Sequence, residues 1–553
     1  MQLRAFTDRR WLLLFSLLSL FLAFELYGPT LQAPYIFDDW ELPYTNPSMR
    51  DAPVSAWMAG NRPILQLSFW LNLGNNPLAT GAFHRVNVLI HCLNALLLYL
   101  ILRRFLPENR WTATVLAGVF LVHPLQTESV AYIAGRSESL AAFFCLAAYA
   151  VYVYRPAEGA LSWRRATAVL GLYATAVLTK ENAVVLPALL LLTDWAGGRS
   201  WRMSLRVYVP IAVLAAAGVL MVARVLGSSR TAGFASPIAP WDEYALTQAR
   251  AVPQYFAMIL LPLRQSMDHD FAFSKSLTDR QTWLYLLLLV GAAGGAWALR
   301  KRFPLGALGV FWFFVCLAPT SSFVPIADPF VERRAYLATA GVLFVAAEAL
   351  RRVRLSAWTA TALAIGVLSG YAALTYQRNV VMRTPLTIWV EAVQHGSTKG
   401  RPYEFLADAA VHVEACADVE PFLRDAVERM PRNLRVLRGA AKVLECMDRP
   451  DEATALLRRA VTLDPKAADI YELLGLVYGA RNELEKARPA LEAALRLKPD
   501  SPAIQMSMAL WYQAAKDWPK AAAGFRRVLQ LEPSNTSALV ALRQIEGNPA
   551  PAN

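Results

Sequence analysis

Long apolar runs separated by short polar segments dominate the first 376 residues of the chain. A membrane-spanning helix needs about 20 apolar residues, and runs of this kind lie at 11–28, 83–102, 111–124, 137–154, 166–180, 182–196, 206–227, 282–299, 304–323, 334–350 and 356–376. The first run follows basic residues but has no small-x-small cleavage site after it, so we interpret it as an uncleaved span. The pattern predicts about eleven transmembrane helices within residues 1–376.

The periodicity changes after residue 400. Prolines recur at 431, 465, 499 and 533, an interval of 34 residues each time, which is the tetratricopeptide period. The clearest unit has the expected packing residues at Tyr471, Leu474, Gly475, Tyr478, Ala487, Leu491, Ala494 and Pro499. We expect residues 401–546 to form an α-solenoid, joined to the membrane part by a helical linker at 377–400 and followed by a tail at 547–553. Such arrays bind proteins or extended peptides on their concave face, although self-assembly or a spacer role is an alternative.

Composition agrees with a membrane protein that carries a soluble part. Of the 553 residues, 56% are hydrophobic and only 18% are charged, and the mean hydropathy is +0.32. Transmembrane helices followed by helical repeats make the predicted fold class all-α. The net charge of +13 does not indicate nucleic-acid binding, because the arginines punctuate apolar runs and form no basic face.

Basic residues set the predicted orientation. Six clusters fall at alternate junctions between apolar runs, at 4–10, 103–110, 155–165, 199–206, 300–302 and 351–354. Cytoplasmic loops retain positive charge, so the N-terminus is expected inside and the repeats outside. The segment 247–263 contains Pro253 and Pro262, and counting it as a span would break this alternation. We interpret it as an interfacial or re-entrant helix.

The other junctions, on the predicted outer side, collect the unusual polar residues. They contain Asp38 and Asp39 between Phe37 and Trp40, Arg62, His123, Glu128, Arg136, Lys180, Glu181, Asp268, His269, Glu332 and Arg333. Ionisable groups at membrane ends are normally functional or paired, and their accumulation from five loops predicts an active-site basin. Read alone, the Asp pair is more typical of a helix N-cap or a solvated loop than of a general base.

Asp268-His269-Asp270 resembles a metal site, but no second cluster with ligand spacing accompanies it, so we assign no metal. A divalent ion remains the weaker alternative. The sequence also contains no glycine-rich phosphate loop and no serine nucleophile elbow, which argues against nucleotide-powered chemistry.

Several motifs together resemble the transmembrane-and-tetratricopeptide O-mannosyltransferase family. They are Phe37-Asp38-Asp39-Trp40, Asn61-Arg62-Pro63, the run from Val122 through Glu138, Lys180-Glu181-Asn182, and Glu332-Arg333-Arg334-Ala335-Tyr336-Leu337 followed by the repeats. The resemblance implies a GT-C fold and a polyprenyl-phosphate sugar, mannose by preference, as the donor. At the last motif this chain has Arg333-Arg334-Ala335, where members typically carry a single arginine and an aliphatic residue before tyrosine. The choice of phosphate-contacting arginine therefore stays open.

The expected reaction is an inverting transfer of sugar to Ser or Thr hydroxyls of a protein acceptor outside the cytosol. Asp38 is the predicted general base, and Asp39 positions the acceptor or shares that role. Donor-phosphate contacts are assigned to Arg62, Arg136, Lys180 and Arg333, because arginine can pair two oxygens at once. Polar contacts with sugar or acceptor are assigned to His123, Glu128, Glu181, Asp268, His269 and Glu332.

Two other classes stay open. A glycosyltransferase acting on a lipid or glycan would use the same basin, and a membrane scaffold without enzymatic activity would need only the array and its anchor. The expected location is a multi-pass integral membrane protein, in a bacterial inner membrane with periplasmic repeats or in the endoplasmic reticulum with lumenal repeats. Cys416 and Cys446 are predicted near the stacked turns of neighbouring units, so an oxidising compartment could link them. Cys92, Cys145 and Cys316 are expected to be buried.

Overall fold

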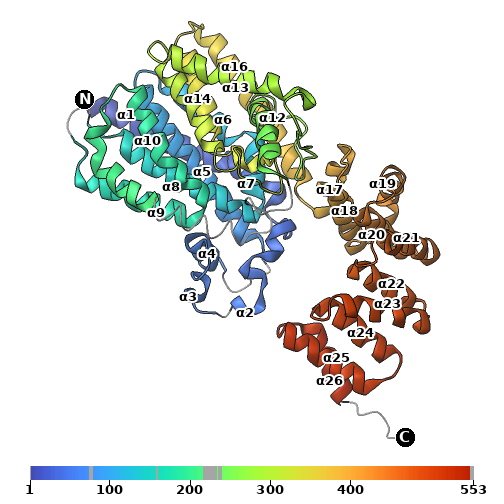
Figure 1. Cartoon of the computed structure of the whole chain (residues 1–553). Helices are drawn as coiled ribbons and strands as arrows, with labels where there is room; N and C mark the ends of the chain where they lie inside the picture. The colour runs from blue at the N-terminus through green and yellow to red at the C-terminus, as the bar shows by residue number, and fades with distance from the viewer. Residues whose placement is uncertain are drawn as a thin grey trace. The chain divides into compact units, whose positions relative to one another are not determined.

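The computed structural model describes residues 2–50, 52–73, 79–156, 160–215, 233 and 239–547. Every regular element in these ranges is a helix (Figure 1), which confirms the all-α fold. The chain divides into two compact units, one formed by residues 1–45 and 49–384 and the other by residues 46–48 and 385–553.

The first unit contains long apolar helices joined by short helical turns. Its α-helices are α1 (Gln2–Leu26), α3 (Val54–Trp57), α4 (Pro63–Trp70), α5 (Gly81–Phe105), α6 (Arg110–Leu121), α7 (Thr127–Ala131), α8 (Arg136–Val153), α9 (Trp163–Thr179), α10 (Leu186–Ala196), α12 (Trp241–Leu260), α13 (Thr282–Leu299), α14 (Pro304–Leu317), α15 (Thr339–Leu350) and α16 (Ala357–Val381), with α2 (Pro47–Arg50) at the division between the units. The 3-10 turns are η1 (Gly28–Thr30), η2 (Phe37–Glu41), η3 (Pro43–Thr45), η4 (Pro124–Gln126), η5 (Ile133–Gly135), η6 (Glu181–Val185), η7 (Trp201–Ser204), η8 (Asp279–Gln281) and η9 (Glu332–Ala335). Helix α5 packs against α1, α6 and α8.

Within the described ranges, three helices are long and apolar enough to cross a membrane. They are Gly81–Phe105, Asp279–Leu299 and Ala357–Val381. A fourth candidate is the bent pair Pro124–Ala131 and Ile133–Val153, whose two parts meet at 101°. Shorter apolar helices occupy several of the other expected spans, and part of the run at 206–227 lies outside the described residues. The count of about eleven spans therefore stays a prediction.

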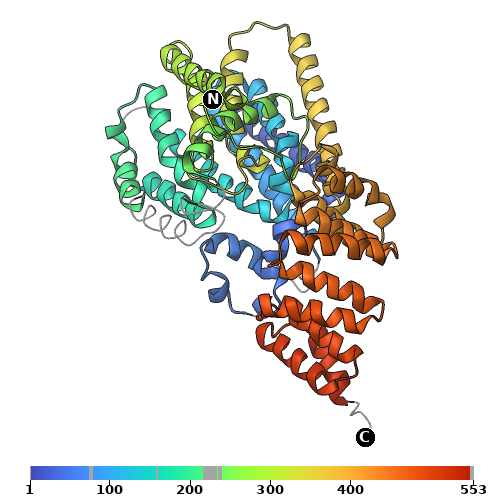
Figure 2. The same cartoon turned by 45° about the vertical axis from the view of Figure 1, so that its right-hand side comes forward.

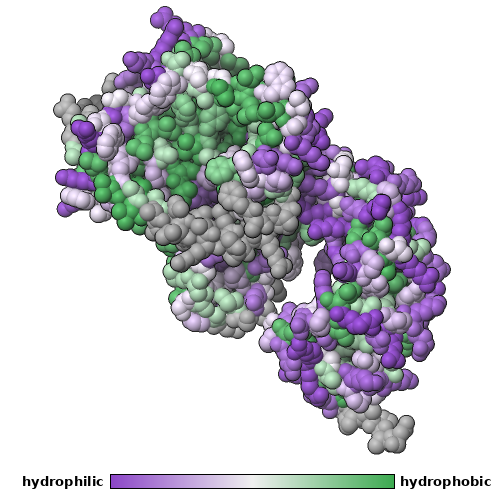
Figure 3. Space-filling model, viewed as in Figure 1, coloured by the Kyte–Doolittle hydropathy of each residue, from purple (hydrophilic) through white to green (hydrophobic). Residues whose placement is uncertain are grey.

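Close helix packing and outward apolar side chains both characterise the first unit. Helices α14 and α15 approach so closely that a Cβ on Gly309 or Gly341 would collide with the backbone of the opposite helix, and small residues permit this kind of approach in membrane bundles. Helices α13 and α16 expose Leu287, Val290 and Ile365. Figure 3 shows hydrophobic residues spread over a broad face of this unit. An apolar outer surface fits contact with lipid.

Two local features differ from the sequence pattern. Helix α12 runs continuously through Pro253 and buries one face, although the two prolines suggested an interrupted segment. Helices α2, α3 and α4 occupy a stretch to which the hydropathy pattern gave no helices. They are short, and α4 begins at Pro63, where proline suits the first turn of a helix.

The second unit is a stack of antiparallel helix pairs, visible from two directions in Figures 1 and 2. It contains α17 (Pro385–Gln394), α18 (Gly400–His412), α19 (Cys416–Arg429), α20 (Leu434–Cys446), α21 (Pro450–Leu463), α22 (Ala468–Ala480), α23 (Leu484–Leu497), α24 (Pro502–Ala514), α25 (Trp518–Leu531) and α26 (Thr536–Gly547). In the clearest repeat, Gly475 lies so near Leu491 that a Cβ would contact its side chain at 2.6 Å. The glycine permits the close packing of α22 on α23.

A disulfide joins Cys416, at the start of α19, to Cys446, at the end of α20. The α-carbons are 6.3 Å apart, within the range that a disulfide spans. The helical positions agree with the sequence prediction, and the bond forms between the two cysteines whose pairing the sequence left open. Cys92, Cys145 and Cys316 are buried free thiols, as expected.

We expect reduction of this disulfide to destabilise the repeat unit. The bond closes a segment with a sequence separation of 30, for which lost chain entropy in the unfolded state is worth about 3 to 4 kcal/mol. A paired Cys416→Ser and Cys446→Ser variant should unfold at a lower temperature and should no longer respond to reductant. Non-reducing peptide mapping of the wild type should recover the two peptides linked, and recovery of both free thiols would contradict the assignment.

Candidate functional site

The two adjacent carboxylates lie in η2 and have different surroundings. Phe37, which opens this turn, has φ of 47°, an uncommon conformation for a residue with a side chain and one that tends to occur at functional sites. Asp38 is partly exposed, whereas Asp39 is fully buried. The next residue, Trp40, is 63% exposed. The turn therefore presents Asp38 beside an open aromatic surface and directs Asp39 inward.

Asp39 anchors η2 to the rest of the first unit. Its Oδ2 accepts the Ile36 N–H at 3.1 Å and its Oδ1 accepts the Ala134 N–H, in η5, at 2.8 Å. Burial raises the pKa of Asp39 to about 8, although the two backbone N–H groups oppose this shift. A buried carboxyl that holds its proton and caps two backbone groups is suited to positioning, so Asp38 is the better placed of the two to accept a proton.

Tyr132 connects Asp38 to a partly buried ion pair. The Asp38 N–H donates to the Tyr132 hydroxyl at 2.9 Å, and this hydroxyl also interacts with the Asp38 side chain. The guanidinium of Arg333 lies over the Tyr132 ring, 5.9 Å from its centre. Tyr132 thus contacts both a carboxylate that can accept a proton, Asp38, and a cation that can stabilise negative charge, Arg333.

Arg333 is held by Glu128. The Arg333 backbone N–H donates to Glu128 Oε2 at 2.9 Å, and its guanidinium donates to Oε1. The Glu128 side chain is 2% exposed and that of Arg333 is 25% exposed. The bend between α7 and α8 permits this arrangement, because a Cβ on Gly135 would lie 2.5 Å from the Glu128 carbonyl oxygen. The partly open edge of Arg333 remains able to meet a ligand.

Two further cations lie in the same electrostatic neighbourhood. Lys180 donates to Glu138 Oε1 at 2.7 Å and to Ser137 Oγ at 3.1 Å, and it experiences the charges of both Arg62 and Arg333. This proximity brings together candidates from three separate loops.

Arg62 forms a two-pronged pair with Glu181. Its Nε and Nη2 donate to the two carboxylate oxygens at 3.0 and 2.6 Å, and the two side chains are 37% and 51% exposed. Burial raises the pKa of Glu181, but the positive charges of Arg62 and Lys180 lower it by more. The pKa of Glu181 is therefore below its usual value. Glu181 is therefore charged, and it holds Arg62 at an accessible position.

Glu332 is buried beside Arg333 and accepts several hydrogen bonds. Its oxygens accept the Ser266 N–H, the His269 ring N–H and the Gln265 amide, each at 2.7 Å. Burial raises the pKa of Glu332, but the contact with His269 lowers it more, and the net direction is downward. Asp268, in the same loop, is also buried. Glu332 thus fixes the loop 265–269 against the Arg333 turn.

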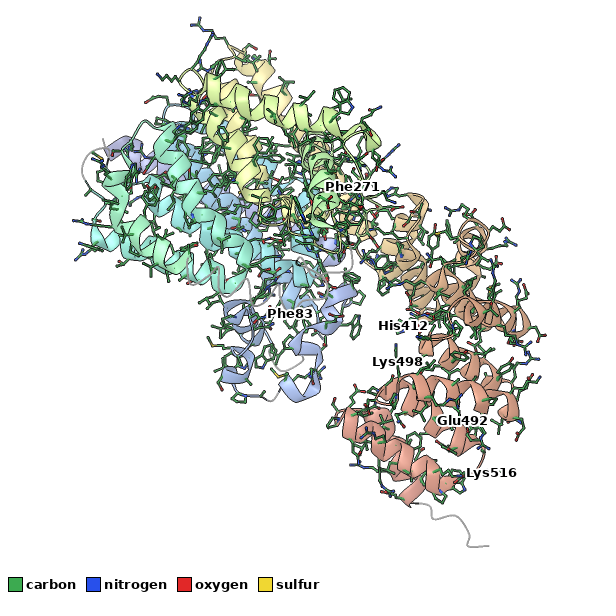
Figure 4. The ribbon with its side chains drawn as sticks, in the orientation of Figure 1. Phe83, Phe271, His412, Glu492, Lys498 and Lys516 are labelled. Atoms are coloured by element: carbon green, nitrogen blue, oxygen red, sulfur yellow. A yellow bond between two sulfur atoms is a disulfide. The ribbon has the colours of Figure 1, made fainter. Side chains whose placement is uncertain are left out.

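Arg136 has no exposed surface and is surrounded by protein oxygens. It donates to Asn87 Oδ1 at 2.6 Å, to Asn72 Oδ1 at 2.7 Å, and to the backbone carbonyls of Ser68 and Phe83. Its guanidinium also lies 5.6 Å from the centre of the Phe83 ring, which is labelled in Figure 4. This environment favours a structural role in joining α4, α5 and α8 over the phosphate contact that the sequence suggested.

His123 is fully buried, and both of its ring nitrogens have protein partners. Nε2 lies 2.8 Å from the Ile259 carbonyl, and Nδ1 accepts the Leu125 N–H at 3.1 Å. The second contact requires Nδ1 to be unprotonated, so the proton is on Nε2. The ring also packs on Tyr371. His123 therefore joins η4 to α12 and α16.

The structure brings Asp38, Glu128, Lys180 and Arg333 into one cluster, with Arg62 and Glu181 at its edge. Glu332, His269 and Asp268 form a supporting layer, while Arg136 and His123 lie deeper. No group of three or more potential ligands is arranged to hold a metal ion within the part of the chain that the structure describes. Sequence reasoning missed Tyr132, because a tyrosine between small and apolar neighbours normally indicates packing. It also missed Asn87, for which a polar amide inside a predicted span was the available signal.

Replacing Asp39 with asparagine should destabilise the first unit. An amide has one accepting oxygen, so either the Ile36 or the Ala134 N–H loses its partner, which costs about 1 to 3 kcal/mol for a buried group. The melting temperature of Asp39→Asn should therefore fall by several degrees. An unchanged melting temperature would contradict the anchoring role.

The same substitution should alter the pH dependence of stability. A folded-state pKa raised to about 8 adds stability that is complete below the unfolded pKa near 4 and is lost as the pH rises toward 8. The wild type should lose this contribution progressively between about pH 4 and about pH 8, with no further loss above that range, whereas Asp39→Asn should not lose it. Parallel thermal-shift curves for the two proteins would contradict the raised pKa.

Comparison with known proteins gives matches of two kinds. A family model described as tetratricopeptide repeat matches residues 447–511. Protein O-mannosyl-transferase TMTC1 of Homo sapiens is 36% identical over 146 residues, covering 23% of this chain and 16% of the relative. Protein O-mannosyl-transferase Tmtc2 of Drosophila melanogaster is 30% identical over 184 residues, covering 30% and 20%. Protein O-mannosyl-transferase F38B6.6 of Caenorhabditis elegans is 24% identical over 343 residues, covering 59% and 48%.

The resemblance to the transmembrane-and-tetratricopeptide O-mannosyltransferases is confirmed. The chain matches less than half the length of each of these relatives. Among solved structures, a thermophilic TPR protein of Thermus thermophilus matches with a TM-score of 0.27 at 21% identity, covering 32% of this chain and 93% of that chain. MamA from Desulfovibrio magneticus RS-1 matches with a TM-score of 0.23 at 23% identity, covering 27% and 85%.

Proposed function

We propose that this protein transfers a sugar, mannose by preference, from a polyprenyl-phosphate donor to Ser or Thr hydroxyls of a protein acceptor. The observation that carries the proposal is the contact chain from Asp38 through Tyr132 to Arg333. It sets a partly exposed carboxylate at the hydroxyl of Tyr132 and a partly exposed cation over the face of the same ring. A displacement at an anomeric carbon needs a proton acceptor and a stabiliser of the leaving group at different ends of the reacting bonds.

The proposed step is an inverting displacement. The acceptor hydroxyl attacks the anomeric carbon and its proton passes to the Asp38 carboxylate. The bond between that carbon and the phosphate oxygen breaks on the opposite face, and the electron pair leaves with the polyprenyl phosphate. Asp39 holds η2 in place through its two backbone contacts, so Asp38 can meet the hydroxyl without reorganisation.

Arg333 is the proposed main contact for the phosphate, supported by Lys180 and Arg62. Each cation is paired with a carboxylate, namely Glu128, Glu138 or Glu181. Such pairs fix the side chains before the donor binds, and arginine retains further N–H groups for phosphate oxygens. The lipid tail would lie along the apolar outer surface of the first unit, since its chain has no reason to leave the bilayer.

Localisation and topology form part of the proposal. A disulfide within the repeats is typical of an oxidising compartment, which agrees with an array outside the cytosol and about eleven spans before it. In this account residues 1–376 form the glycosyltransferase domain, residues 377–400 the linker and residues 401–546 the acceptor-binding array. The membrane would be a bacterial inner membrane, or the endoplasmic reticulum in a eukaryote.

The class of acceptor is tested by comparing cells with and without the gene. We expect hexose on Ser or Thr of exported proteins to be lost in the deletion and restored by the wild type but not by Asp38→Asn. Loss of a modified lipid or glycan with unchanged proteins would select the alternative acceptor. Restoration by Asp38→Asn would favour a scaffold without enzymatic activity.

A further inference from the structure

A cavity lies on the first helices of three successive repeats, α18, α20 and α22. Its volume is about 370 Å³, and its lining includes the apolar side chains of Phe405, Leu434 and Ile470. Trp389 stacks on Phe405 with ring centres 4.8 Å apart, and Ile470 is buried in the repeat core. The apolar part of the lining, which we call the floor, is therefore held in place by neighbouring side chains.

Charged side chains surround this floor and are paired with one another. Arg438 contacts Glu404 on the preceding repeat and Asp469 on the following repeat. Arg435 approaches Glu404 at 3.6 Å, and Arg438 is partly buried, with a side chain 24% exposed. A further ion pair joins two successive repeats, between Lys442 and Asp408. The cavity lining therefore contains two cations, Arg435 and Arg438, and three carboxylates, Glu404, Asp408 and Asp469. Lys442 lies outside the lining and balances the third carboxylate through its pair with Asp408.

This rim disfavours a charged ligand. An acidic or basic side chain entering the cavity would have to separate one of these pairs, and a partly buried charge that loses its partner is destabilised. The paired groups still retain unused N–H donors and oxygen lone pairs. They can hydrogen-bond to a peptide main chain, whose amides carry no net charge.

Equivalent positions change from charged to apolar along the array. Asp408, Lys442, Leu476 and Leu510 occupy the same position in four successive repeats, at intervals of 34 residues. Leu476 on α22 and Leu510 on α24 are each 42% exposed. A peptide that crosses these helices would first meet the Asp408–Lys442 ion pair and then the exposed side chains of Leu476 and Leu510.

We propose that the cavity binds one bulky apolar side chain of an extended, uncharged polypeptide segment, while Arg438 and its carboxylates hold the main chain. This inference rests on the proposed function, in which the array binds the protein acceptor. It adds a sequence preference to that function, because recognition depends on an apolar residue and on the absence of charge. The hydroxyl that receives the sugar would lie elsewhere on the same segment.

Binding of fluorescent peptides to the full-length protein in detergent tests this proposal. The peptides are built from Gly, Ala and Asn, without Ser, Thr or charge, and differ only at a central Leu, Gly, Asp or Lys. Burial of the leucine side chain should make the Leu peptide bind about 10-fold more tightly than the Gly peptide. The Asp and Lys peptides should bind no better than the Gly peptide.

Two substitutions localise the effect. Ala467 lines the cavity, so Ala467→Leu should fill it and remove the preference for the Leu peptide. Ala523 lines a different cavity, of about 290 Å³, formed with Met508 and Tyr512, so Ala523→Leu is the matched control and should keep the preference. Thermal melting of both variants shows whether each is folded, and the ranking of peptides on the wild type does not depend on either variant.

Equal binding of the four peptides to the wild type, or a folded Ala467→Leu protein that retains the preference, would overturn the cavity proposal. The peptides contain no Ser or Thr and cannot accept sugar. Peptide binding therefore tests the cavity proposal, and a separate transfer assay tests the proposed function. A wild type that transfers sugar but shows no leucine preference would overturn the cavity alone. A clear preference in a protein without transferase activity would instead overturn the proposed function, on which the identity of the bound segment as acceptor depends.

Discussion

Asp38→Asn should reduce sugar transfer by about 10²- to 10⁴-fold, the range that a well-placed general base contributes. The substitution preserves the shape of the side chain and leaves the Asp38 N–H able to donate to Tyr132, a contact made by the backbone. Folding and donor binding should therefore be retained. Initial rates with a polyprenyl-phosphate sugar and an acceptor protein measure the loss, and binding of the donor measured separately shows that the defect is in the chemical step.

The matched control for this experiment lies in the same turn. Glu41 is an exposed carboxylate at the end of η2, and Glu41→Gln removes one negative charge without touching the contacts of Asp38. We expect its transfer rate to stay close to that of the wild type. If Asp38→Asn remains within about tenfold of the wild type, Asp38 is not the base.

Arg333→Lys should reduce transfer by about 100-fold, since lysine keeps the charge but loses the planar fork that can pair two phosphate oxygens. Lysine is preferable to alanine here because Glu128 is buried and would be left without a cation. Removing one partner of such a pair is strongly destabilising in its own right. The loss should be largest in kcat, since charge on the phosphate grows as its bond to the sugar breaks.

The neighbouring arginine provides the control. Arg334 donates to the backbone carbonyls of Asp328 and Pro329, and these contacts direct it away from the Glu128 pair. Arg334→Lys should therefore change transfer only slightly. A loss at position 334 that exceeds the loss at 333 would reverse the assignment of the phosphate contact.

The repeat unit was predictable from sequence because its determinants are local. Each helix pair packs through residues that recur every 34 positions. The contact between Gly475 and Leu491 can therefore be predicted from the sequence of one unit. The proximity of Cys416 and Cys446 was also predictable, since the period places both near the same stacked turns, but the distance that allows a bond came only from the structure. Helix bounds in the membrane part were less predictable, because short apolar helices and long ones have the same composition.

The separate environments of Asp38 and Asp39 could not be read from the sequence. They depend on Ala134 and Tyr132, which are more than 90 positions away along the chain. The burial of individual arginines could not be predicted from the sequence either. Arg136 and Arg333 both follow polar loops, but only the structure reveals that Asn72 and Asn87 enclose the first and that Glu128 holds the second with one edge open.

The most direct test is transfer by the purified full-length protein. Wild type and Asp38→Asn are incubated in detergent with polyprenyl-phosphate mannose and an unfractionated extract of the host's exported proteins, and the proteins are then mapped by mass spectrometry. We expect hexose on Ser or Thr residues with the wild type and none above background with Asp38→Asn. Wild-type protein that binds the donor but adds no hexose to any protein, or equal addition by the two proteins, would contradict the proposed function.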